Sequence, residues 1–223
     1  MPVTRLLNAK NKALVILIFS YIFLGIFHAS TLAAVALCRK WYGLLVGGTL
    51  MLAAIPFHLR GRKHPHGYLI SYFLNAVAAG FSVSAYYLKK NIAVCLPDML
   101  VAAVPAAVIL LSAYLLLRCF CKRKKTAIAA ALVLNLLLLI SRVLSWRTDN
   151  GFGFFCALIS LFSLWVYAVT VNRDRSVLRD ISFGSFGTFI LLTLAVLIIL
   201  TEGDTLDGLD IDFGTGGKRK KKK

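Results

Sequence analysis

Residues 13–38 read ALVILIFSYIFLGIFHASTLAAVALC. These 26 residues include no Asp, Glu, Lys or Arg. A bilayer core about 30 Å thick is crossed by roughly 20 residues of α-helix, because each residue adds about 1.5 Å of rise. A soluble domain does not need an apolar run of this length, whereas a membrane-spanning helix does. This stretch therefore predicts a transmembrane helix and indicates the fold class of the chain.

Six further apolar stretches follow, and short loops that carry basic residues separate them. With the first stretch, they range from 17 to 26 residues in length. The seven predicted spans are Ala13–Cys38, Trp41–Phe57, Tyr68–Leu88, Met99–Phe120, Thr126–Leu144, Phe152–Val171 and Ile181–Leu200. The sequence therefore predicts an all-α, polytopic transmembrane helix bundle of about seven spans, with six and eight spans as the alternatives.

The chain divides into one membrane domain and two short polar ends. Residues 1–12 form a basic N-terminal segment, residues 13–200 a single transmembrane helical domain, and residues 201–223 a tail that we expect to be flexible. The tail carries five carboxylates and then six consecutive cations at 218–223.

The distribution of loop cations predicts the orientation of the bundle. Lys and Arg number 14 in the N-terminal segment and the second, fourth and sixth loops, against 6 in the other three loops. Cytoplasmic loops carry the excess of positive charge, so the N-terminus is predicted to be cytoplasmic, and seven spans then place the C-terminus outside. The cations at 218–223 argue the other way, because they favour the anionic cytoplasmic leaflet. A cytoplasmic C-terminus would require six or eight spans, or an N-terminus on the outside.

The overall charge favours lipid as a partner. The sequence has 26 Lys and Arg against 9 Asp and Glu, a formal net charge of +17, and 59 % hydrophobic residues, compared with about 45–50 % in soluble proteins. The cations lie in loops between apolar runs, which favours anionic lipid headgroups over nucleic acid. The basic residues expected to face lipid are Arg60, Arg62, Lys63, Lys122, Arg123, Lys124 and Lys125. We expect a multi-pass protein of a bacterial cytoplasmic membrane or, in a eukaryote, of the endoplasmic reticulum membrane.

Glycines at helical spacing predict close packing between spans. Gly43 and Gly47 form a Gly-x-x-x-Gly pair in the second span, and Gly184 and Gly187 lie in a local repeat over residues 182–189. Small residues let neighbouring backbones approach each other in membrane helix pairs. Such surfaces also suit a second copy of the chain or another membrane protein as a partner.

Polar side chains inside the spans predict a seam or cavity in the interior of the bundle. Such groups turn away from lipid, toward partners or water. In the third span they recur at i, i+4, i+11 and i+15, which is one face of a helix, and the sixth span shows a similar face. The candidate seam or cavity residues are His28, Ser71, Asn75, Ser82, Tyr86, Asn135, Arg142, Ser160, Ser163 and Tyr167.

The sequence favours a protein without enzymatic activity or a cofactor. We find no Ser-His-Asp set, His-Glu-x-x-His pair or phosphate loop, and the three histidines of residues 58–66 are interleaved with cations that oppose a divalent metal. No Asp or Glu lies in the middle of a span, which disfavours proton-coupled and cation-coupled transport.

Three functional hypotheses follow. The first is a non-enzymatic membrane protein that assembles through its polar and small-residue seams, with its basic loops at anionic lipid. The second is a transporter or facilitator for a small neutral or anionic solute that passes along a polar seam. The third is an enzyme that acts on lipid headgroups.

Overall fold

The computed structural model describes residues 12–38, 42–119, 124–144, 151–171 and 176–206, and within these ranges the chain forms seven α-helices. They are α2 (Lys12–Leu37), α3 (Tyr42–Arg60), α4 (His66–Lys89), α5 (Leu96–Cys119), α6 (Lys124–Leu144), α7 (Phe152–Val171) and α8 (Val177–Leu206). Each predicted span corresponds to one helix, so the predicted all-α fold is confirmed over these residues.

The last helix differs most from its prediction. It begins at Val177 and ends at Leu206, so the first six residues of the predicted flexible tail are helical. Hydropathy marks where an apolar run ends, and a helix continues past that point unless a proline or a capping residue stops it. Asp180 lies in the first turn of α8, where a carboxylate interacts favourably with the free N–H groups of the helix start.

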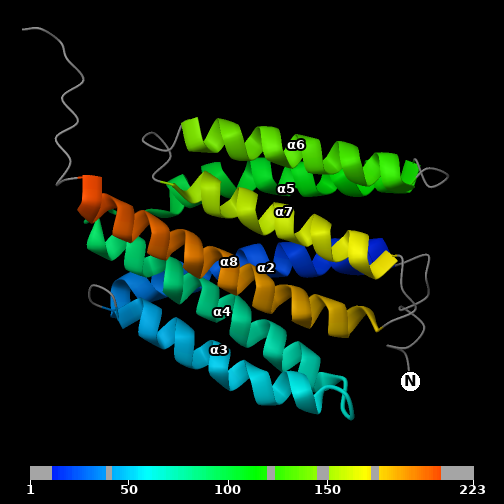
Figure 1. The fold of residues 1–223 in the computed structure, drawn as a ribbon, viewed down its shortest axis with the longest axis horizontal. Helices are drawn as coiled ribbons and strands as arrows, with labels where there is room; N and C mark the ends of the chain where they lie inside the picture. The colour runs from blue at the N-terminus through cyan, green and yellow to red at the C-terminus, as the bar shows by residue number, and fades with distance from the viewer. Residues whose placement is uncertain (1–11, 39–41, 120–123, 145–150, 172–175, 207–223) are drawn as a thin grey trace, which may run out of the picture.

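Successive helices run in opposite directions along the bundle (Figure 1). The helices α2, α4, α6 and α8 begin at one end, and α3, α5 and α7 begin at the other. We call the first end, where α2 begins, the α2-start end. The opposite end is the α2-finish end, and α8 also finishes there.

The helix α4 lies at the centre of the packing. It contacts α3, α2 and α8 extensively, while α7 joins this group to the pair formed by α5 and α6. In α4, 15 of the 24 residues are buried, and many of them are Gly, Ala or Ser, for example Ala76, Ala78, Ala79 and Gly80. Side chains this small let three neighbouring helices approach α4 closely.

Large apolar side chains cover the outer surface of the bundle. Leu52 on α3 is 61 % exposed, Val101 on α5 is 64 % exposed and Ile198 on α8 is 52 % exposed. An apolar surface of this extent is a liability in water and is the normal exterior of a protein in lipid. By length and composition, α2, α3, α4 and α8 can each cross a membrane over their described residues, while the described apolar parts of α5, α6 and α7 are shorter. The fold therefore indicates a membrane location.

Candidate functional site

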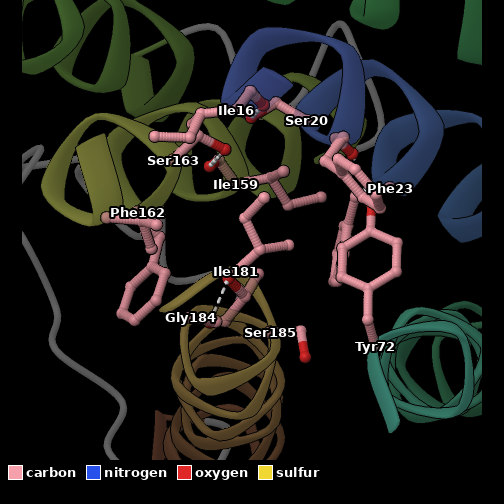
Figure 2. A pocket seen from close by; sticks show the side chains of 13 residues that line it. Ile16, Ser20, Phe23, Tyr72, Ile159, Phe162, Ser163, Ile181, Gly184 and Ser185 are labelled. Carbon is pink, nitrogen blue, oxygen red and sulfur yellow. Dashed lines mark hydrogen bonds between the residues drawn. The ribbon is translucent and has the colours of Figure 1, made fainter. Parts of the chain in front are cut away.

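A small, partly open pocket, which we call the cavity, lies between α2, α4, α7 and α8. Its volume is about 30 Å³, and since one water requires roughly 10–15 Å³ by the same measure, it has room for one or two small molecules. Figure 2 shows Ser20 from α2, Tyr72 from α4, Ser163 from α7 and Ser185 from α8 around this space. Apolar side chains such as Ile159 complete the walls.

The cavity lies nearer the α2-start end of the bundle. Ser20 falls in the first half of α2, and Ser185 falls in the first third of α8. Both helices begin at this end (Figure 1). The cavity residue of α4, Tyr72, is likewise close to the start of its helix.

Every hydroxyl group that lines the cavity donates a hydrogen bond to a main-chain carbonyl oxygen. The serine and threonine donors use carbonyls of their own helices, and the tyrosine reaches from α4 to α2. The bonds are Ser20 Oγ to Ile16 O (2.8 Å), Ser163 Oγ to Ile159 O (2.9 Å), Ser185 Oγ to Ser182 O (2.7 Å), Thr188 Oγ1 to Gly184 O (3.0 Å) and Tyr72 Oη to Phe19 O. Local bonds of this kind are the usual way for Ser and Thr to satisfy a hydroxyl inside a helix.

Asn75 supports the cavity wall from behind. Its side chain is fully buried, and its Nδ2 donates to Ser185 Oγ at 3.0 Å. The other amide atom, Asn75 Oδ1, is buried and has no hydrogen-bond partner among the described residues. This side-chain bond joins α4 to α8, two helices that begin at the same end of the bundle.

A second polar contact joins α3 to α8 at the α2-start end. His58 Nδ1 and Ser182 Oγ are 2.8 Å apart. The imidazole also meets the rings of Tyr68 and Phe186 edge-on, with centroid distances of 5.2 and 5.5 Å. These contacts hold the last turn of α3 against α4 and α8, so we assign His58 a packing role.

His28 does not line the cavity; it pairs with Cys156 instead. The His28 Nδ1 atom lies 2.6 Å from Leu24 O, and its Nε2 lies 3.5 Å from Cys156 Sγ. Because a carbonyl only accepts, Nδ1 carries the proton and Nε2 accepts from the thiol. Phe152 stacks near the same imidazole at a centroid distance of 6.4 Å. The pair therefore joins α2 to α7.

The predicted polar face of α4 is divided between several neighbours. Asn75 meets α8, and Ser82 lies against Gly47 of α3. Tyr86 packs on Phe155 of α7 at a centroid distance of 5.9 Å. Ser71 is fully buried, and its Oγ has no hydrogen-bond partner within the described ranges. One face of α4 therefore meets different helices at different heights.

The remaining seam residues lie apart from this group. Asn135 is fully buried on α6, and Arg142 is partly exposed near the end of the same helix. The extensive contacts of α6 are with α5 and α7, so these two residues do not share a site with Asn75. Ser160 is buried and donates to Cys156 O at 2.9 Å, and the side chain of Tyr167 falls outside the described part of the structure.

The predicted basic residues fall into two groups. Arg60, Arg62 and Lys63 are exposed where α3 ends and turns into α4. Lys122 and Arg123 lie outside the described residues, as do the side chains of Lys124 and Lys125.

The predicted packing glycines all lie at contacts between helices. A Cβ on Gly43 would lie 2.5 Å from Phe81 O, and one on Gly47 would lie 2.8 Å from Ala78 O. Real Cβ atoms do not approach other atoms this closely, so only glycine fits where α3 crosses α4. On α8, Gly184 faces Val166 and Gly187 faces the ring of Phe162, both on α7.

Sequence reasoning did not find a further contact of this kind, which is at Gly80. A Cβ there would lie 2.7 Å from Phe27 O and 2.8 Å from Thr31 N, both main-chain atoms of α2. Thr31 Oγ1 also lies 3.4 Å from Gly80 O. The signal was the Ala-Ala-Gly run at 78–80, which marks a face of α4 that another backbone can approach.

Comparison with known protein families, curated proteins and solved structures finds no match. Among the described residues, no three His, Cys, Asp or Glu side chains form a group that could hold a metal ion. The polar side-chain groups that line the cavity are hydroxyls in an otherwise apolar wall.

Proposed function

We propose that this chain is a non-enzymatic, seven-span protein of a bacterial cytoplasmic membrane, assembled through glycine contacts and polar side chains, with its basic loops at anionic lipid. The observation that carries the proposal is the construction of α4. Its small residues let α2 and α3 pack against its backbone. The helices that pack around α4 carry apolar side chains on their outer faces. A second copy of the chain or another membrane protein is the expected partner within the membrane.

The charges agree with an N-terminus on the cytoplasmic side. The exposed cations Arg60, Arg62 and Lys63 lie at the α2-start end of the bundle. In the proposed topology this end faces the cytoplasm, where anionic headgroups attract basic residues. The alternating helix directions then place the end of α8 on the other side.

Arg60→Gln, Arg62→Gln and Lys63→Gln together are expected to weaken binding of phosphatidylglycerol on the order of 100-fold at low salt. Each cation near an anionic surface contributes about 1 kcal/mol, and about 1.4 kcal/mol is tenfold in affinity. The measurement is the fluorescence of the purified protein in detergent, titrated with phosphatidylglycerol that carries a quencher. The titration is repeated with phosphatidylcholine that carries the same quencher, and at high salt.

Lys90→Gln is the matched control, because Lys90 is an exposed cation at the other end of α4. Lys90→Gln should weaken phosphatidylglycerol binding by no more than the loss of one charge does. Equal binding of the two lipids by the unmodified protein would contradict the proposed lipid contact.

The cavity supports a second candidate function, a facilitator for a small uncharged solute. Five hydroxyls line a space between four helices toward the α2-start end. Toward the α2-finish end, Tyr87 stacks on Phe152 with a centroid distance of 4.4 Å, and Phe155 packs beside them. This aromatic cluster packs α4 against α7 toward the end of the bundle that is farther from the cavity. Solute flux that depends on the cavity residues distinguishes this candidate from the first.

A further inference from the structure

We propose that the cavity between α2, α4, α7 and α8 binds small uncharged molecules that donate hydrogen bonds, such as water and ammonia, and that it rejects anions. The inference rests on the facilitator function proposed for this cavity and states which solutes it accepts. Its basis is the direction of the hydrogen bonds in the cavity wall.

The donors of the wall are already in use. Ser20, Ser163, Ser185 and Thr188 each direct the hydroxyl proton to a carbonyl of their own helix, and the hydroxyl proton of Tyr72 goes to Phe19 O. A hydroxyl oxygen has two acceptor lone pairs as well as one proton. The wall therefore offers acceptor oxygens to a guest and keeps its protons for the backbone.

Asn75 acts on the cavity wall through Ser185. It uses its Nδ2 on Ser185 Oγ at 3.0 Å, which fixes the amide so that Oδ1 is the remaining polar atom. That oxygen is fully buried behind the cavity lining and has no partner in the described structure. Because Ser185 Oγ accepts this bond and donates its own proton to Ser182 O at 2.7 Å, it has no proton left for a guest.

Charge and size further restrict which molecules the cavity can bind. An anion requires hydrogen-bond donors, and here each hydroxyl would first have to break its bond to a main-chain carbonyl oxygen. A cation requires a compensating negative charge when it leaves water, and the cavity lining contains no Asp or Glu. The volume of about 30 Å³ admits one or two molecules the size of water. Water and ammonia donate hydrogen bonds, carry no charge and are small enough, so both meet these conditions.

The test is solute uptake by vesicles that contain the full-length protein. Ammonia entry is followed by the rise in internal pH, water flow by osmotic shrinkage, and chloride entry by quenching of a trapped dye. We expect ammonia and water to move several-fold faster than in empty vesicles, and chloride to move at the rate of empty vesicles.

Thr188→Val and Ser163→Ala test whether the flux uses this cavity. Each removes one lining oxygen with little change in shape, and each should lower the excess flux about fivefold, the effect of one lost hydrogen bond. Thr201→Val is the matched control, because Thr201 lies on α8 with the same bond to its own helix, Leu197 O at 2.9 Å, but is exposed. Ser20→Ala on α2 provides an independent variant if either of the others fails to fold.

The outcomes separate the two proposals. Chloride uptake above that of empty vesicles would contradict the proposed rejection of anions, but it would be consistent with the facilitator function. Ammonia and water flux that Thr188→Val, Ser163→Ala and Ser20→Ala all leave unchanged would overturn the assignment to this cavity. Rates equal to those of empty vesicles for all three solutes would overturn the facilitator function itself, and the selectivity with it.

Discussion

Gly80→Ala is expected to destabilise the bundle by about 3 kcal/mol or more, the upper end of what overpacking usually costs. The added Cβ would lie 2.7 Å from Phe27 O and 2.8 Å from Thr31 N. Both are main-chain atoms inside α2, so no side-chain rotation relieves the clash, and α2 and α4 must separate. Because α4 also holds α3 and α8, the separation disturbs the centre of the bundle.

Gly25→Ala is the control for the same chemical change. Gly25 lies on α2, and a Cβ there would meet nothing within 4 Å. Alanine is favoured over glycine inside a helix by roughly 0.8–1 kcal/mol, so this variant should be neutral or slightly more stable. The measurement is thermal unfolding in detergent, followed by circular dichroism. Equal unfolding midpoints for the two variants would show that α2 and α4 do not meet at Gly80.

Asn75→Asp is the second change with a large expected effect. The substitution keeps the size of the side chain but replaces the donor Nδ2 with an oxygen, which faces Ser185 Oγ at a fully buried position. An aspartate at the centre of a membrane helix costs roughly 2.5–3.5 kcal/mol, and the lost bond between α4 and α8 adds about 1 kcal/mol. We expect a large fall in the yield of folded protein at neutral pH.

Acidification should partly rescue this variant. A protonated carboxyl group is uncharged and can donate to Ser185 Oγ, as the amide does, so stability should rise as the pH falls toward 4, about the ordinary range of an aspartic acid. Asn91→Asp is the control, because Asn91 lies in the exposed turn after α4 with a positive φ of 52°, which Asp also tolerates. The readout is the folded fraction by size-exclusion chromatography at pH 7 and pH 5. Wild-type behaviour of Asn75→Asp at pH 7 would contradict the Asn75–Ser185 contact.

The helices could be predicted from sequence because each depends on a continuous local run of residues. Residues 13–38 illustrate this, since their length and lack of charge are sufficient to predict a helix, and α2 forms at Lys12–Leu37. The contact of Gly43 and Gly47 with α4 also had a local signal, their four-residue spacing. The end of α8 had none, because the apolar run stops at Leu200 and the helix continues to Leu206.

The cavity could be anticipated only in part, because it depends on which helices are neighbours. The sequence places Asn75 and Asn135 inside spans, but it does not say that α4 packs on α2, α3 and α8 while α6 packs on α5 and α7. Ser163 was singled out from its helical face, whereas Ser20, Ser185 and Thr188 were not. Single hydroxyls are common in membrane helices, and only the three-dimensional arrangement brings these together.

The most direct test of the proposed architecture is the accessibility of single cysteines in the membrane. In a chain whose five native cysteines have been replaced, the variants Thr4→Cys, Lys63→Cys, Asn91→Cys and Thr215→Cys are treated with an impermeant maleimide from each side. Seven spans with a cytoplasmic N-terminus predict that positions 4 and 63 react only from the cytoplasmic side and positions 91 and 215 only from outside. Reaction of positions 4 and 215 from the same side would contradict the seven-span arrangement.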